Sequence, residues 1–230
     1  MRHVSFSARR LLGLAFGTAV ALCSQSALAN FQSDITVKLI APGGIVGSPA
    51  PISVSQLVTT ANFATGITAA GGGAVGTWML NAEEITFSGN SIHVRSYAGD
   101  DTGGVLTTGY LGSGGQHARY EFDGLSIAGK TIVGVNIFAF DGYADSGVTG
   151  LLGSASSLVH YIDTDTISLD LDSILFADRG TGTSNAHADF RIDLITRDAT
   201  NPGGTVPEPA TLALFAIAAL GAGAARRRGA

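Results

Sequence analysis

Three pairs of aspartates have a spacing that could bring two carboxylates to one cation. The pairs are Asp141 and Asp145, Asp163 and Asp165, and Asp170 and Asp172. Calcium takes six to eight oxygen ligands, which carboxylates and loop carbonyls can supply together, although none of these pairs has the spacing of an EF-hand. Residues two apart on a strand also point to one face, so such pairs arise on solvated polar surfaces. Two alternatives stay open: a calcium site at Asp141, Asp145, Asp163 and Asp165, or no cofactor.

The residue types that support catalysis lack the spacing of a catalytic motif. The four histidines beyond the N-terminal segment form neither HExxH nor another close metal-binding pattern; they are His93, His117, His160 and His187. No G-x-S-x-G sequence is present to hold a nucleophilic serine. We therefore expect a binding protein rather than an enzyme. A secreted hydrolase, with two carboxylates facing each other across a cleft, stays an alternative.

Aromatic side chains are relevant to carbohydrate binding because a sugar can stack on an exposed ring. Tyr110 and Tyr143 lie in stretches rich in glycine and polar residues, so we expect both to be exposed and to contact a ligand. Trp78 is followed by Met79 and Leu80, a context that favours packing in the core. The two tyrosines keep a carbohydrate-binding module open as an alternative function.

These candidate residues lie among segments in which apolar and polar residues alternate with a period of two, the pattern of half-buried strands. Such strands are expected at residues 34–40, 84–87, 91–97, 118–124, 158–162, 166–172 and 188–195. The segment 131–140, TIVGVNIFAF, is apolar on both faces and fits a strand in the middle of a sheet. No segment between the termini has a clear amphipathic helical pattern. We therefore expect an all-β fold, a β-sandwich that is jelly-roll-like.

Glycine-rich stretches separate the expected strands and are predicted to be loops. They span residues 64–77, 100–116 and 141–157. None ends in GK[ST] between a strand and a helix, so none has the pattern of a phosphate-binding loop. Residues 197–205, RDATNPGGT, predict a flexible linker that follows the β-sandwich domain, which we place at residues 30–196.

The charge of the central region excludes nucleic acid as a partner. Residues 30–205 contain seventeen acidic and seven basic residues, a formal net charge of −10, whereas the whole chain carries −5. Binding to the phosphates of a nucleic acid requires a basic surface. An acidic domain of this kind fits an outer compartment of the cell.

The N-terminus contains the three parts of a secretory signal peptide in their usual order. These are the basic residues Arg2, Arg9 and Arg10, the apolar residues 11–22, and the small residues Ala27 and Ala29 before the cleavage site. We expect signal peptidase to remove residues 1–29. Cleavage would also remove Cys23, the single cysteine, and with it any disulfide or thiolate chemistry.

The C-terminal segment predicts a short transmembrane helix. Residues 210–225 carry no charge, and as a helix they would rise about 24 Å at ~1.5 Å per residue. The hydrocarbon core of a bilayer is ~30 Å thick, so Arg226, Arg227 and Arg228 would have to reach the headgroups. Because basic flanks stay in the cytoplasm, the Pro-Glu-Pro sequence before the helix would lie at the outer face of the inner membrane.

The sequence Pro207-Glu208-Pro209, the apolar helix and the arginine cluster together resemble a PEP-CTERM sorting signal, over residues 206–230. The prolines hold the backbone extended, a conformation that a processing enzyme can bind. The resemblance implies that these three residues are recognised by an exosortase, a membrane-embedded cysteine transpeptidase. It also implies a Gram-negative bacterium that makes exopolysaccharide.

The segments together predict an exported protein of the cell surface or extracellular matrix. Its processing partners would be signal peptidase and the exosortase, and its C-terminal helix would tether it to the inner membrane before processing. We expect a structural or adhesive role in the exopolysaccharide layer of a biofilm matrix, in which the domain binds polysaccharide through loops on a rigid sandwich.

Overall fold

The computed structural model describes residues 30–80, 82–102, 105–140, 151–152, 154–176, 182–184 and 186–199. Several predicted features lie outside these residues: the signal peptide with Ala27 and Ala29, the loop residues Asp141, Tyr143 and Asp145, and the sorting signal with Pro207, Glu208, Pro209, helix 210–225, Arg226, Arg227 and Arg228. Within the described part of the chain, no helix is both long and apolar enough to cross a membrane.

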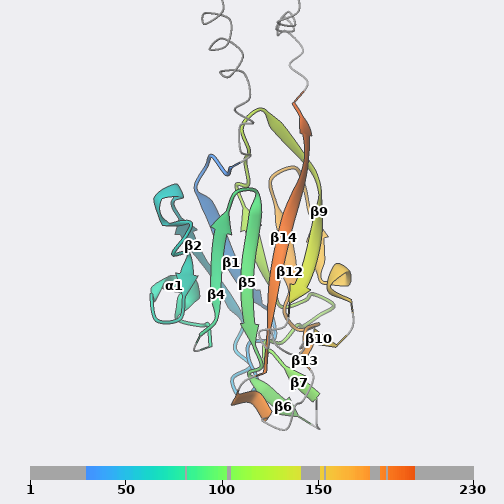
Figure 1. Cartoon of the computed structure of the whole chain (residues 1–230). Coiled ribbons are helices and arrows are strands. Elements are labelled where there is room, and N and C mark those ends of the chain that lie inside the picture. The colour runs from blue at the N-terminus through green and yellow to red at the C-terminus, as the bar shows by residue number, and fades with distance from the viewer. Residues whose placement is uncertain are drawn as a thin grey trace, which may run out of the picture. The chain divides into compact units, whose positions relative to one another are not determined.

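Two five-stranded sheets form the body of the structure (Figure 1). The first has the strand order β11-β12-β8-β1-β2, with β1 at Ile35–Ala41, β2 at Ile52–Val58, β8 at Arg119–Asp123, β11 at Val159–Tyr161 and β12 at Ile167–Asp170. The second has the order β3-β4-β5-β14-β9, with β3 at Ile67–Thr68, β4 at Glu84–Ser88, β5 at Ser91–Tyr97, β9 at Lys130–Phe140 and β14 at His187–Asp198.

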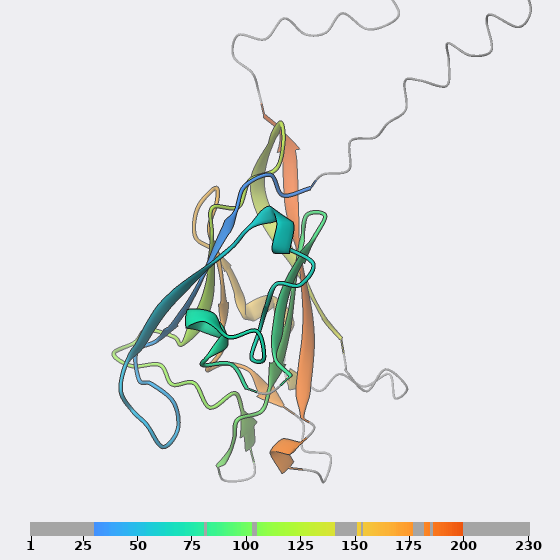
Figure 2. The ribbon, with the colours of Figure 1, turned by 90° about the vertical axis from the view of Figure 1, so that its left-hand side faces the viewer.

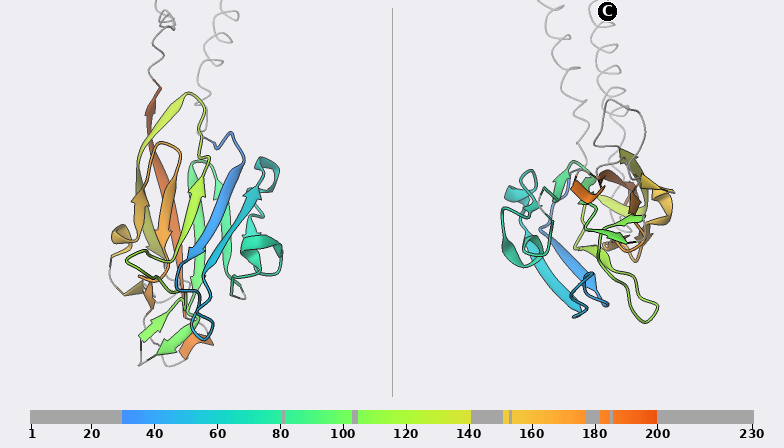
Figure 3. Two further views of the ribbon diagram at one scale, coloured as in Figure 1. Left: turned by 180° about the vertical axis from the view of Figure 1, so that it is seen from behind. Right: turned by 90° about the horizontal axis from the view of Figure 1, so that it is seen from below.

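A smaller sheet lies at one end of these two sheets (Figure 3). Its order is β10-β13-β7-β6, with β6 at Asp100–Thr102, β7 at Val105–Thr107, β10 at Leu151–Leu152 and β13 at Leu175–Phe176. The described helices are single turns: α1 at Gly73–Gly76 and 3₁₀ turns at Thr60–Asn62, Ala155–Ser157 and Gly182–Ser184. Strands account for 52% of the structure, which confirms the expected all-β fold.

The two large sheets face each other across one hydrophobic core, as the edge-on view shows (Figure 2). Alternation along β1 buries Ile35, Val37 and Leu39 completely, because successive side chains of a strand point to opposite faces. Phe87 of β4 and Phe122 of β8 meet edge to face, with ring centroids 6.3 Å apart, and so join the two layers. The jelly-roll character of the connections stays a prediction.

The position of β9 differs from the prediction for residues 131–140. Because the segment is apolar on both faces, we expected a central strand, but β9 is the edge strand beside β14. Val133 and Phe138 are accordingly exposed, the latter to 42%. The guanidinium of Arg191 lies over the Phe138 ring, 4.6 Å from its centroid. The prediction was wrong because the apolar pattern does not report how many neighbours a strand has.

Several other boundaries also differ from the sequence-based expectations. β2 was not among the predicted strands, and β6 and β7 form inside the expected loop at residues 100–116. β3 and α1 form inside the expected loop at residues 64–77. β14 continues through Arg197 and Asp198, two residues into the expected linker. Strands of two or three residues are too short to show a period, so their pairing becomes visible only in the folded chain.

Candidate functional site

An open groove of about 580 Å³ lies beside the connection between β7 and β8. It is lined by Thr107, Tyr110, Leu111, Gly112, Ser113, Gly114, Gly115, Gln116, His117 and Asp172. The lining combines hydroxyl, amide, imidazole and carboxylate groups with one exposed leucine. A groove of this size with a few converging polar groups is typical of a site for a small ligand or a segment of a polymer.

The loop that borders the groove has a defined shape. Ser113 and Gln116 exchange two backbone hydrogen bonds of 3.0 Å. Between them, Gly114 and Gly115 have φ angles of +62° and +78°, the combination that a type I′ turn requires and that favours glycine. Leu111 exchanges backbone hydrogen bonds with Gly43 and Gly44 in the β1–β2 connection. These hydrogen bonds therefore fix the backbone that carries the polar side chains of the groove.

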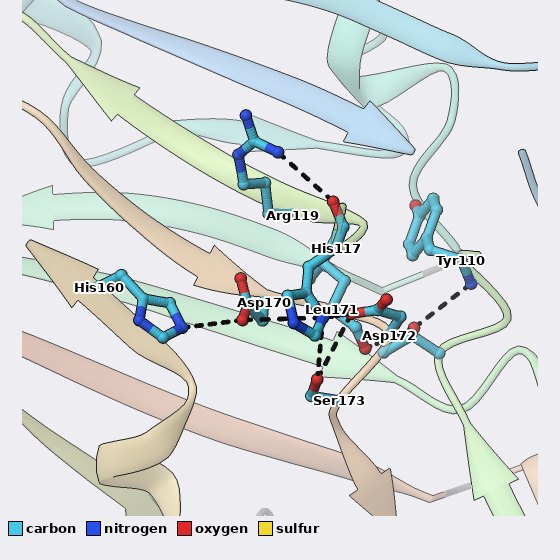
Figure 4. A network of polar contacts seen from close by, with 9 residues as sticks. Tyr110, His117, Arg119, His160, Asp170, Leu171, Asp172 and Ser173 are labelled. Carbon is cyan, nitrogen blue, oxygen red and sulfur yellow. Dashed lines mark hydrogen bonds and ion pairs between the residues drawn. The ribbon is translucent and has the colours of Figure 1, made fainter. Parts of the chain in front are cut away.

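Two histidines and two aspartates form a polar network at one side of the groove (Figure 4). The Nδ1 atom of His117 is 3.0 Å from Oδ1 of Asp172, and Nε2 of His160 is 2.9 Å from Oδ2 of Asp170. The side chain of Asp170 is only 5% exposed, whereas both imidazoles are more than half exposed. Leu171, between the two aspartates, accepts a 2.9 Å hydrogen bond from the Thr108 hydroxyl. These bonds link the ends of β7, β8 and β12 to one another.

Neighbouring carboxylates change the proton affinity of His117. Its hydrogen bond with Asp172 is the main cause that raises its pKa above the usual value, and the charges of Asp170 and Asp172 add to the effect. Because a raised pKa favours the cation, His117 keeps its proton to a higher pH than a free histidine. Whenever His117 is protonated, its charge is paired with the carboxylate of Asp172 at 3.0 Å.

The variant Asp172→Asn is expected to lower the pKa of His117 towards the unperturbed value of ~6.5, because it removes the carboxylate whose hydrogen bond is the largest cause of the rise. Titration of the imidazole chemical shifts by NMR would measure this change. His93 lies on β5 and His187 on β14, both in the other sheet, and the substitution should leave their chemical-shift curves unchanged, so they serve as internal controls. An unchanged His117 curve in the variant would contradict the assigned role of Asp172.

Ser173 lies close to this network but does not complete a nucleophilic triad. Its hydroxyl is 3.4 Å from Nδ1 of His117 and 3.5 Å from Oδ1 of Asp172. The serine and the aspartate therefore both approach the same ring nitrogen. A proton relay needs the serine at one nitrogen of the imidazole and the carboxylate at the other. The arrangement suits the binding of hydroxyl groups better than the activation of a serine.

The predicted calcium ligands are only partly within the described residues. The carboxylate of Asp163 accepts a 3.1 Å hydrogen bond from the backbone N–H of Asp165, which is the main cause that lowers the pKa of Asp163. The hydroxyl of Thr166 donates to Asp165 at 3.1 Å. Asp141 and Asp145 lie outside the described residues. In the ranges that the structure describes, no three or more His, Cys, Asp or Glu side chains are grouped so that they could hold a metal ion, and calcium at these aspartates stays a prediction.

The expected exposure of Tyr110 and burial of Trp78 are both wrong. Tyr110 is 3% exposed, whereas Trp78 is 40% exposed. The phenolic hydroxyl of Tyr110 donates a 2.7 Å hydrogen bond to the carbonyl of Trp78. The sequence contains a signal for this burial, because Leu106, Thr108 and Tyr110 continue the alternating buried face of β7 beyond its end. Tyr143 lies outside the described residues.

Comparison with known proteins identifies the C-terminal segment. Residues 205–228 match the PEP-CTERM protein-sorting motif, which confirms the resemblance seen in Pro207, Glu208 and Pro209. No curated protein and no solved structure matches the chain. The motif implies processing by an exosortase and export to the cell surface through a membrane-anchored intermediate. The chain therefore carries a PEP-CTERM protein-sorting motif, which supports its prediction as an exosortase substrate.

Proposed function

We propose that the exported domain binds a polysaccharide of the extracellular matrix through the groove beside His117 and Asp172. The observation that carries this proposal is the lining of the groove, which offers hydrogen-bond donors and acceptors together. Sugar hydroxyls both donate and accept hydrogen bonds, so they match a mixed lining of this kind. The sorting motif supports the proposal because it implies export to the cell surface, where such polymers are found.

The role is structural or adhesive, in the exopolysaccharide layer, and involves binding without turnover. Ser173 and Asp172 share one nitrogen of His117, which supports binding over nucleophilic catalysis. Before reaching this layer, the chain loses residues 1–29 to signal peptidase. Helix 210–225 then tethers it to the inner membrane until the exosortase acts.

Calcium would take part in this binding if Asp141, Asp145, Asp163 and Asp165 act together. Asp163 and Asp165 are already held in one turn by the hydrogen bond between them. Calcium would have to gather further oxygens from carbonyls or from the polysaccharide itself, because it takes six to eight ligands. The alternative within the same proposal is a groove that binds the polymer without a cation.

The test is binding of the processed protein, purified from its host, to the host's own exopolysaccharide in calcium or in EDTA. We expect saturable binding that Asp172→Asn weakens about threefold or more, because it removes a charged acceptor from the groove. Asp193→Asn is the matched control, because Asp193 lies on β14 in the other sheet, and should bind like the wild type.

The two buffers separate the alternatives. Loss of binding in EDTA would support calcium at the four aspartates, and binding that EDTA does not change would assign recognition to the groove. Saturable binding of short soluble oligosaccharides would favour a carbohydrate-binding module over a purely adhesive role. Absence of binding in both buffers would contradict the proposed function.

A further inference from the structure

Trp78 stands at the rim of a second, smaller hollow. This hollow has a volume of about 80 Å³ and is lined by Ile45, Val46, Trp78, Leu80, Gly99, Thr108, Gly109 and Tyr110. Tyr110 also lines the groove described above, so the two depressions adjoin. Val46 and Leu111, one at each depression, are exposed apolar side chains. A surface with an exposed indole and apolar neighbours therefore continues into the polar groove.

The backbone of Trp78 is fixed on both sides. Its N–H donates a 2.9 Å hydrogen bond to the carbonyl of Val75, and its own carbonyl accepts the hydroxyl of Tyr110 at 2.7 Å. Two residues later, Leu80 donates its N–H to the carboxylate of Glu83 at 2.8 Å, and Glu83 donates its N–H to the carbonyl of Leu80 at 3.0 Å. A large ring on an anchored backbone loses little conformational entropy when a ligand binds, which makes it an effective contact residue.

The charges around Trp78 favour a neutral ligand. None of the residues that line the smaller hollow is charged at neutral pH. Among the residues that line the adjoining groove, His117 is the one side chain that can become a cation, and Asp172 lies 3.0 Å from it and would pair with that charge. A polyanion would find no unpaired cation in either depression and would meet a domain of net negative charge. A neutral pyranose polymer presents apolar C–H faces to an indole and hydroxyl edges to a polar groove.

We propose that Trp78 is the stacking platform for a pyranose ring of a neutral polysaccharide, whose adjoining sugars occupy the groove beside His117. Tyr110 is a positioning residue: it does not touch the sugar but holds the backbone of Trp78 through its hydroxyl. This inference rests on the proposed function, which it deepens by naming the contact residue and the charge class of the polymer.

The fluorescence of the protein reports directly on this site, because Trp78 is the one tryptophan of the chain. The experiment titrates the processed protein with soluble neutral polymers, a β-glucan and a galactomannan, with the acidic polymer alginate and with the host exopolysaccharide. We expect at least one neutral polymer to shift the emission to shorter wavelength and to reduce acrylamide quenching about twofold or more, because a bound sugar covers the exposed part of the ring. Alginate should change neither quantity.

Substitutions of Trp78 test whether its ring contacts the polymer. Trp78→Ala should weaken binding of the neutral polymer about tenfold or more, as truncation of a central aromatic contact does, and Trp78→Phe should restore part of the affinity. Phe138→Ala is the matched control, because Phe138 is an equally exposed aromatic residue on β9, and should bind like the wild type.

Tyr110→Phe removes only the hydroxyl and should weaken binding about threefold to tenfold. It should also alter the acrylamide quenching of Trp78 in the free protein, because the backbone that carries the ring loses this hydrogen bond. Tyr161→Phe is its matched control, since the Tyr161 hydroxyl donates a similar 2.8 Å hydrogen bond to the carbonyl of Ile132. This control should change neither binding nor quenching.

The outcomes distinguish this inference from the proposed function. One outcome is that host exopolysaccharide binds Trp78→Ala as well as the wild type and leaves the fluorescence of the wild type unchanged. The assignment of Trp78 as the stacking platform would then be wrong, and the proposed function would stand. If no polymer changes the emission or quenching of Trp78, the inference is overturned whatever else binds. Stronger binding of alginate than of every neutral polymer would overturn the assigned charge class.

Discussion

Replacement of Pro207, Glu208 and Pro209 together by alanine is expected to abolish processing at the C-terminus. The matched motif covers these residues, and we expect an exosortase to recognise them in extended form. Both prolines fix their own φ angle and keep the preceding residue out of the helical region. Alanine would allow helix formation next to the apolar segment that is predicted to be a helix. We therefore expect the uncleaved precursor to accumulate in the membrane fraction, with almost none released or transferred to the cell surface.

Fractionation with an antibody to the domain, followed by mass spectrometry of the C-terminus, would measure this effect. The matched control replaces Asn201, Pro202 and Gly203 by alanine, which changes three residues including a proline just before the motif. This control should be processed normally. Normal processing of the Pro-Glu-Pro variant would falsify the assignment of these residues as the recognition sequence.

Removal of the Glu83 carboxylate is expected to cause a large loss of stability in the described domain. Glu83 is 1% exposed, and its carboxylate accepts hydrogen bonds from the N–H of Leu80 at 2.8 Å, the N–H of Tyr97 at 2.9 Å and the hydroxyl of Ser96 at 3.4 Å. In Glu83→Ala these buried donors lose their acceptor. The free energy of unfolding should fall by about 3 kcal/mol, the cost of leaving such groups unpaired.

Glu83 is also expected to make stability depend on pH. Burial raises the pKa of Glu83 to about 7 from its usual value of 4.5, against the opposing effect of its hydrogen bonds. Between pH 4.5 and 7 the folded state therefore binds more protons at this site than the unfolded state. The contribution of Glu83 to the free energy of unfolding is fully present below pH 4.5. It decreases by about 3 kcal/mol as the pH rises to above 7.

Urea unfolding of the processed protein at pH 5 and pH 8 would test both statements. Glu83→Gln keeps the size of the side chain but cannot ionise, so it should remove the decrease in stability between the two pH values. Glu84→Gln is the matched control, because Glu84 is the next residue, is partly exposed and lies 3.7 Å from Arg95. Its effect should stay within about 0.5 kcal/mol. An unchanged pH dependence in Glu83→Gln would contradict the role of this carboxylate.

The strands that could be predicted are those in which one face is buried over several residues. Ser91–Tyr97 and Arg119–Asp123 alternate clearly, and both form strands at these positions. Glu84–Ser88 and Val159–Tyr161 were also expected, with small differences at their ends. Period-two alternation arises locally from the pleat of a strand, so a single sequence contains it.

The candidate site could not be predicted in the same way. His117 and Asp172 are 55 positions apart, and His160 and Asp170 come together because β11 pairs with β12. The register of that pairing decides which side chains face each other, and register depends on the whole sheet. The exposure of Tyr110 could not be predicted either. Its glycine-rich context predicted an exposed ring, whereas the fold buries the ring and pairs its hydroxyl with the carbonyl of Trp78.

The sequence by itself determined the sorting of this protein and the all-β class of its domain. The Pro-Glu-Pro sequence, the apolar segment and the arginines follow one another along the chain, and an enzyme can read them as a linear signal before or without folding. Only the tertiary structure decided that Trp78 is exposed, that Glu83 is buried and that a groove forms beside His117 and Asp172. The physical reason is that burial and proximity are properties of paired sheets and a shared core, which bring together residues far apart in the chain.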